Sequence, residues 1–468
     1  MKFAEFPYER PDLQTAMAQL DTLSRSISGA PTAEDAKKAF LSFEEIAEQI
    51  GSLSAICYVR HTVNTRDLFY EKENAFWDES LPLFTDKQLD IYRAMLSSPH
   101  RTALEQDLGK LLFTKMEIDV KSADPSIIPL MQEENGLQTE YQQLYASAQI
   151  PFAGKILTVA QLTPYKQDPN RAVRKAAFEA EGRFFDENRE KFDEIYDKLV
   201  KNRTKQARLM GYDNFIPLGY IRMKRNGYGI SEVEEYRKKI AEEIVPVVTQ
   251  LKKVQQRRIG ADSMQYFDDT FLFPDGNPVP FGNADEILAA GQQMYRALSP
   301  ETAEFIDFMF HSELFDVLAK EGKAPGGYCT YIPSQKSPFI FSNFNGTAGD
   351  VDVLTHEAGH AFAAYQAAKR ELLPEYADNT LEACEVHSMS MEFLTSDYHH
   401  LFFADQTDKY QLFHAESAVF FLPYGCMVDE FQHIVYGNPE LSPQQRNEAW
   451  MELEKKYRPY LTFGDLPF

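Results

Sequence analysis

The sequence contains few cysteines and no long apolar run. Of its 468 residues only four are cysteine, namely Cys57, Cys329, Cys384 and Cys426, and no two of them form a C-x-x-C pair. A fold held together by disulfides is therefore not expected, and a reducing compartment is favoured. No run of about 18 apolar residues occurs, so we expect no membrane-spanning helix.

Positive charge is also scarce. The chain has 48 Lys and Arg against 71 Asp and Glu, for a formal net charge of -23. Binding to nucleic acid requires clustered Lys and Arg, so no nucleic-acid partner is expected. The excess of acidic residues is interpreted as a solubility feature. The opening segment, MKFAEFPYERPDLQ, lacks the apolar stretch of a signal peptide. We therefore expect a cytoplasmic protein.

Aromatic residues and helical periodicity are abundant instead. Hydrophobic residues make up 44% and aromatic residues 13% of the chain, enough for a large core. A chain of this length exceeds one ordinary core and suits two lobes. We predict a mainly α fold with a helical N-terminal lobe over residues 1–210 and a second lobe over residues 211–468. The boundary is placed where glycine-rich sequence interrupts the helical pattern.

Apolar spacing and turn residues predict the individual elements. Asp168 is predicted to cap a helix whose first residue is Pro169. The other predicted helices cover residues 12–50, with a break at Gly29–Pro31, residues 68–113 and residues 232–258, whereas β structure is predicted within residues 150–162 and 326–344. The second β segment comes directly before the most informative part of the chain.

That part is the motif His356-Glu357-Ala-Gly-His360. Apolar residues recur at helical spacing from Asp350 to Tyr365, which predicts a helix. Two imidazoles four residues apart lie on one face of a helix and can bind one zinc ion at about 2.0–2.1 Å. Glu357 is placed to act as a general base without binding the metal. A catalytic zinc site needs a third protein ligand and an open position.

A second helix is predicted to supply that third ligand. Asn379 is predicted to cap this helix, with Glu382 completing a capping box. Glu385 then lies one turn inside the helix and is our predicted ligand. Glu382 and Glu392 are expected to support the site without binding the metal, and His387 is expected to point away from Glu385. This arrangement predicts one zinc per chain.

These motifs resemble the thimet oligopeptidase and oligoendopeptidase F family of zinc metallopeptidases. The resemblance is carried by His-Glu-Ala-Gly-His, by Glu385-x-x-Ser388-x-x-x-Glu392 and by the preceding β segment, and it is closest to the oligoendopeptidase F branch. It is most specific over residues 322–438, which include FLPYGCMVDEFQHIVYGNP. The resemblance implies a helical, two-lobed, zincin-like fold with a small β element beside the active-site helix and a deep channel.

The resemblance also implies a function and a set of site residues. A zinc-activated water would hydrolyse internal peptide bonds of oligopeptides, with His356, His360 and Glu385 as zinc ligands and Glu357 as the base. Gly326 and Gly327 would offer a backbone edge to the substrate.

Members of the family continue into helices whose His and Tyr side chains contact the substrate, and no such segment follows residue 461 in this sequence. Either the chain is a truncated form or its active site is completed differently. Tyr424, His414 and His433 are candidates to replace those side chains, but we expect them to pack or cap locally.

Two alternatives remain open at this stage. One is a zinc carboxypeptidase or dipeptidyl carboxypeptidase, because such enzymes use the same kind of helix pair. The other is a peptide-binding protein that contains zinc but does not cleave.

Overall fold

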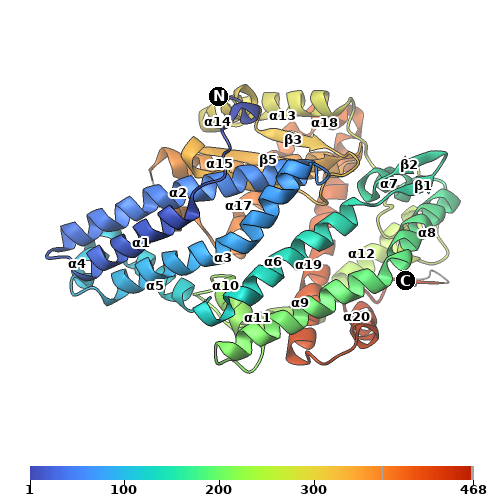
Figure 1. Cartoon of the computed structure of the whole chain (residues 1–468). Helices are drawn as coiled ribbons and strands as arrows, with labels where there is room; N and C mark the ends of the chain where they lie inside the picture. Colours follow the sequence, from blue (N-terminus) through green and yellow to red (C-terminus); the bar gives the residue numbers. More distant parts are fainter. Residues whose placement is uncertain (372, 465–468) are drawn as a thin grey trace.

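The chain folds mainly into helices, which confirms the predicted fold class (Figure 1). This computed structural model describes residues 1–371 and 373–464. The helices of the first half are α1 (Leu13–Ser28), α2 (Ala33–Val63), α3 (Leu68–Ser97), α4 (Arg101–Leu108), α5 (Lys110–Val120), α6 (Ile128–Ala146), α7 (Val159–Lys166), α8 (Arg171–Glu187), α9 (Arg189–Leu209) and α10 (Phe215–Arg222). Those of the second half are α11 (Ile230–Lys239), α12 (Val245–Arg258), α13 (Ala284–Leu298), α14 (Pro300–His311), α15 (Gly349–Lys369), α16 (Pro374–Ala377), α17 (Leu381–Leu394), α18 (His400–Phe403), α19 (Thr407–Gly437) and α20 (Pro443–Tyr457).

Two small sheets complete the fold. Strands β1 (Ile150–Phe152) and β2 (Lys155–Leu157) form the hairpin predicted within residues 150–162. The second sheet has the order β3-β5-β4, in which β3 (Phe315–Leu318) is parallel and β4 (Tyr328–Ile332) antiparallel to β5 (Ser337–Phe344). Strands β4 and β5 confirm the predicted β segment, whereas β3 was missed because it is a run of only four residues. Strand β4 lies at an edge of this sheet.

The helix boundaries follow side-chain caps. Asp12 accepts a hydrogen bond from the backbone N–H of Thr15 at the start of α1, and Thr32 caps α2 in the same way. The predicted helix start at Asp168 and Pro169 is wrong. Asn170 is the cap of α8, because its side chain accepts from the backbone N–H two residues on, and Asp168 accepts from the N–H of Asn170.

The helix predicted over residues 232–258 is present but is not α-helical throughout. A π-helical turn over Ile240–Ile244 joins α11 to α12. Pro246 follows this turn. Since proline has no N–H and its ring crowds the carbonyl four residues earlier, a wider turn at this point is expected.

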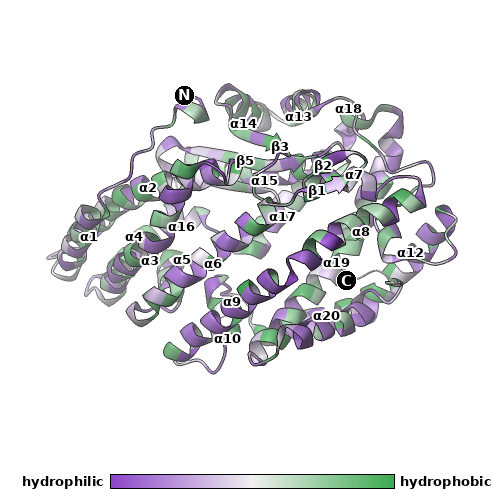
Figure 2. Ribbon diagram, turned by 45° about the vertical axis from the view of Figure 1, so that its right-hand side comes forward, coloured by the Kyte–Doolittle hydropathy of each residue, from purple (hydrophilic) through white to green (hydrophobic). Residues whose placement is uncertain are grey.

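Apolar side chains gather in two large cores. One lies among α1 to α5 and contains Phe40, Phe43 and Trp77, and the other surrounds the three-stranded sheet and contains Phe339 and Phe341. Figure 2 shows hydrophilic and hydrophobic residues together along the long helices, as expected of helices with one buried face. The lobe boundary after residue 210 stays a prediction. Among the described residues no helix is long and apolar enough to cross a membrane.

Candidate active site

Helix α15 carries the histidine motif and packs against strands β5 and β4 of the three-stranded sheet. Its buried face consists of small and aliphatic residues, including Val351, Leu354, Ala358 and Ala361. These residues join the core around the sheet. The packing leaves His356 and His360 only partly buried. The helix therefore presents its two imidazoles away from the core.

Gly359, between the two histidines, allows α17 to approach α15 closely. A Cβ atom at this position would lie 2.7 Å from the Cα of Ser388 and 2.8 Å from the carbonyl oxygen of His387. These distances are shorter than packed atoms tolerate, and both contacts are with backbone that cannot rotate away. Only glycine permits this contact, which places Glu385 of α17 beside the histidines of α15.

The donor atoms of His356, His360 and Glu385 all lie within 4.8 Å of one another. Glu385 Oε2 is 3.1 Å from His356 Nε2 and 3.8 Å from His360 Nε2. Two donors on a tetrahedral zinc ion, each at about 2.0–2.1 Å, lie roughly 3.3 Å apart. Two imidazoles with one carboxylate are a donor set that zinc prefers. No other group of this kind occurs among residues 1–371 and 373–464.

The carboxylate of Glu385 is held in an anionic state. Its hydrogen bond with His356 is the main cause that lowers the pKa of Glu385 to about 2, and Ser388 Oγ donates a further bond of 2.7 Å to Oε2. A carboxylate must be deprotonated to bind a metal. Glu385 is therefore in the state that a ligand requires.

Glu357 lies beside this group and faces the sheet. Its side chain is buried, and burial raises the pKa of Glu357 to about 7. Its Oε2 has no hydrogen-bond partner among the described residues. A Cβ atom at Gly327 would lie 3.4 Å from Oε1 of Glu357 and 3.2 Å from Val353. The carboxylate thus lies against the backbone at the start of β4.

A pocket of about 660 Å³ opens between β4, α15 and α17. It is lined by Gly327, Tyr328, Cys329, Thr330, Tyr331, His356, Glu357, His360, Ala363, Ala364, Gln366, Ala367, Arg370, Tyr376, Ala377, Asn379, Leu381, Cys384, Glu385 and His387. His387 was expected to point away, but its ring centroid is 5.5 Å from that of His360. Ser388 makes the closest contact with Gly359. The side chains of Glu385 and His387 lie on either side of that contact, so both reach the pocket.

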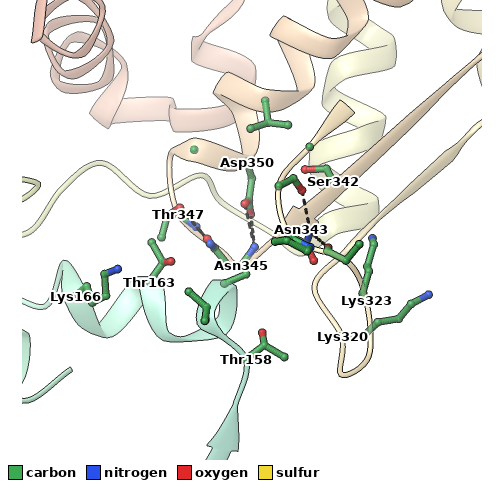
Figure 3. A pocket seen from close by; sticks show the side chains of 18 of the residues that line it. Thr158, Thr163, Lys166, Lys320, Lys323, Ser342, Asn343, Asn345, Thr347 and Asp350 are labelled. Carbon is green, nitrogen blue, oxygen red and sulfur yellow. Dashed lines mark hydrogen bonds between the residues drawn. The ribbon is translucent and has the colours of Figure 1, made fainter. Parts of the chain in front are cut away.

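A second pocket, of about 490 Å³, shares Gly327 with the first (Figure 3). Figure 3 shows Thr163 and Lys166 on the α7 side of this pocket, facing Asn343 and Asn345. Asn343 Nδ2 donates to the carbonyl oxygens of Ala324 and Gly326.

Asn343 thereby holds the loop that precedes β4 and places Gly326 and Gly327 at the border of the two pockets. Their role as a substrate-binding edge stays a prediction.

On the far side of His356 from Glu385 lies Glu392. Its Oε1 is 2.7 Å from His356 Nδ1, and its Oε2 is 2.6 Å from His414 Nε2 on α19. Burial acts to raise the pKa of Glu392, but these two hydrogen bonds outweigh it and lower the pKa below its ordinary value. His414 was expected to pack locally, and this contact with Glu392 was missed because no local pattern links α17 to α19.

The other two candidates make their contacts away from this site. Tyr424 lies under the guanidinium of Arg458, and His433 Nε2 is 3.2 Å from the hydroxyl of Tyr220. Neither lines the pocket around His356 and Glu357. The expectation that they do not contact substrate stays a prediction.

The cap predicted for α17 is wrong. Thr380, not Asn379, is the N-cap, and its hydroxyl accepts a hydrogen bond from the backbone N–H of Ala383. Glu382 therefore does not complete a capping box. Its carboxylate instead accepts two hydrogen bonds from the guanidinium of Arg225. Shifting the cap by one residue leaves Glu382 free to make this ion pair.

Two models of known protein families match the chain. Residues 3–123 match the peptidase M3 N-terminal domain, and residues 164–273 and 303–463 match peptidase family M3. The second match includes the histidine motif of α15 and all of α17. No protein among the curated sequences compared matches the chain.

Solved structures of similar proteins share the fold. The fold is similar to PZ peptidase A with an inhibitor, with a TM-score of 0.98 and 47% identity over 99% of this chain and 82% of that one. It is equally similar to a protein provisionally named oligoendopeptidase F, with a TM-score of 0.98 and 46% identity over 100% and 82% of the two chains. A third, from Bacillus anthracis str. Ames and provisionally given the same name, has a TM-score of 0.96 and 48% identity over 98% and 84%. The chain therefore belongs to peptidase family M3, with the oligoendopeptidase F proteins.

Proposed function

We propose that this peptidase is a zinc-dependent oligoendopeptidase that hydrolyses internal bonds of short peptides. One zinc ion per chain would be held by His356, His360 and Glu385. The observation that supports this best is the convergence of these three donors beside Glu357, in a pocket bordered by the edge strand β4.

When bound at such a site, zinc supplies Lewis acidity, which polarises a carbonyl and makes a water molecule more acidic. Glu357 is proposed as the general base. Its Oε2 has no hydrogen-bond partner among the described residues, so it is free to accept a proton. A base in this position takes a proton from water and delivers it to the leaving amine.

The edge of β4 supports recognition of a peptide backbone. Among the described strands β4 pairs only with β5, so its other edge has unpaired backbone groups facing the pocket side. An extended peptide can add to such an edge through main-chain hydrogen bonds. Gly327 leaves room at this edge, because a Cβ atom there would lie 3.2 Å from Val353 and 3.4 Å from Oε1 of Glu357. Backbone recognition of this kind favours oligopeptides of varied sequence.

The test uses a peptide blocked at both ends, with a fluorophore and quencher on either side of its centre. The purified protein should cleave it internally, as located by mass spectrometry. A chelator should abolish cleavage, and stoichiometric zinc should restore it. Cleavage only of an unblocked peptide, from its C-terminus, would favour a carboxypeptidase. Peptide binding without cleavage, with zinc present, would favour a binding protein.

A further inference from the structure

A chain of hydrogen bonds runs from the candidate metal centre into the protein. Glu392 Oε1 meets Nδ1 of His356 at 2.7 Å, and Glu392 Oε2 meets Nε2 of His414 at 2.6 Å. One carboxylate of α17 thus bridges two imidazoles, one from α15 and one from α19. The side chain of Glu392 is only 12% exposed.

Aromatic rings surround His414 and restrict its orientation. Its side chain is buried, and its ring centroid lies 4.7 Å from that of Phe393 and 5.9 Å from that of Tyr410. The Tyr410 ring is nearly parallel to the His414 ring, at an interplanar angle of 21°. A ring enclosed in this way directs its Nε2 at Glu392 and at no other carboxylate of the described chain.

A second contact keeps α19 in register with α15. The hydroxyl of Tyr410 donates to Asp352 Oδ1 at 2.5 Å. Tyr410 and His414 are one turn apart on α19, and Asp352 and His356 are one turn apart on α15. Helices α15 and α19 are therefore connected at successive turns. Asp352 bonds Tyr410 directly, and His356 is connected to His414 through Glu392.

The other histidine of α15 has no such support. Among the described residues the only carboxylate paired with His360 is that of Glu385, at 3.8 Å. His387 packs edge-on against the His360 ring. The chain of hydrogen bonds therefore acts on His356 alone.

We propose that His414 is a positioning residue of the metal centre, which acts through Glu392 to hold the imidazole of His356 with Nε2 directed at the metal. This rests on the proposed zinc site. A carboxylate bonded at only one oxygen can rotate, whereas a second partner on the other oxygen fixes its plane. Burial acts to lower the pKa of His414, but the hydrogen bond with Glu392 and the charge of Asp352 outweigh it, so the pKa is raised. The raised pKa favours the charged imidazole as the donor to Glu392.

The experiment compares three variants of the whole chain. His414→Phe keeps a flat ring but removes the donor, whereas His414→Gln keeps an N–H that can reach Glu392. Phe403→Leu is the control. The Phe403 ring stacks on Tyr410, with 3.8 Å between the ring centroids, but it takes no part in the hydrogen bonds through Glu392. Zinc affinity is measured by competition with a chelator, and the visible spectrum of the cobalt-loaded protein reports the ligand geometry.

We expect His414→Phe to weaken zinc binding about 10–100-fold, as is typical when the partner of a ligating histidine is lost. The cobalt spectrum should shift in that variant and return toward wild type in His414→Gln. Phe403→Leu should lower thermal stability but leave zinc affinity unchanged. If His414→Phe does not fold, His414→Asn replaces it, because its shorter amide does not reach Glu392.

Unchanged zinc affinity and spectrum in a folded variant without the donor would overturn the proposal. An equal loss of affinity in Phe403→Leu would also overturn it, because the effect would then be general packing. If wild type binds no zinc, or if His360→Ala binds as much as wild type, the proposed metal site itself has failed.

Discussion

On the pocket side of His356 the side chain of Glu385 is 47% exposed, whereas on the opposite side that of Glu392 is 12% exposed and bonded at both oxygens. The pocket side also contains Glu357, which has one oxygen without a partner among the described residues. The buried side is connected to α19 through His414 and Tyr410.

This difference separates two tasks of a metal site. A metal ligand such as the His356 imidazole must be held in one orientation. A buried carboxylate that is hydrogen-bonded at both oxygens holds its partner in this way. A catalytic group must instead keep an atom free for the reacting proton, which requires an unsatisfied position next to a pocket. The two sides of one imidazole are therefore expected to respond differently to substitution, and the following predictions test this.

The largest effect is expected from removing a ligand on the pocket side. His360→Ala should lower the bound zinc from about one ion per chain to a small fraction, because two donors bind the metal far more weakly than three. Metal analysis of dialysed protein measures this. His400→Ala, at an exposed histidine, is the control and should bind zinc normally. Equal zinc in wild type and His360→Ala would show that the ligands are misassigned.

Replacing the proposed base should affect turnover but not the metal. Glu357→Gln keeps the size of the side chain and removes its basic carboxylate. We expect zinc and peptide binding to persist, while cleavage of the quenched peptide falls about 10²–10⁴-fold. Near-normal cleavage would refute the proposed role of Glu357. Loss of zinc in this variant would show instead that Glu357 supports the metal.

On the buried side Glu392→Gln should weaken zinc binding about 10–100-fold, because it removes the carboxylate that bonds His356. Glu382→Gln is a matched change on the same helix. Its pair with Arg225 is partly exposed, so we expect an effect on stability below about 1 kcal/mol and little effect on zinc. Zinc competition and thermal melts measure both. A larger loss of zinc from Glu382→Gln would reverse the roles given to these two residues.

The contact between α15 and α17 is tested through the stability of the fold. Gly359→Ala should destabilise the fold by about 1–3 kcal/mol, because its new methyl group overlaps the backbone at Ser388. Gly51→Ala is the control, since a Cβ atom there meets nothing within 4 Å, and it should stabilise α2 by about 0.5–1 kcal/mol. Denaturant unfolding measures both. Equal stability of the two variants would contradict the close contact inferred at Gly359.

Features that depend on a short stretch of sequence were predicted correctly. The hairpin within residues 150–162, the helix break near Gly29 and the β segment before α15 were all predicted, because turn residues and apolar spacing are local. Helix starts were predicted less well. Asn170 and Thr380 are the caps of α8 and α17, each offset from the prediction by one or two residues, because several neighbouring side chains can serve as caps.

The sequence by itself determined the three-residue metal set and its neighbouring base as hypotheses. The spacing of His356 and His360 places both imidazoles on one helix face. Glu385 was chosen as the third ligand because it lies about one turn inside the next predicted helix. Only the tertiary structure placed His387 in the pocket, closed α17 onto Gly359 and brought His414 to Glu392. These contacts join separate helices, and their formation depends on how the helices pack, for which apolar periodicity gives a buried face but no specific partner.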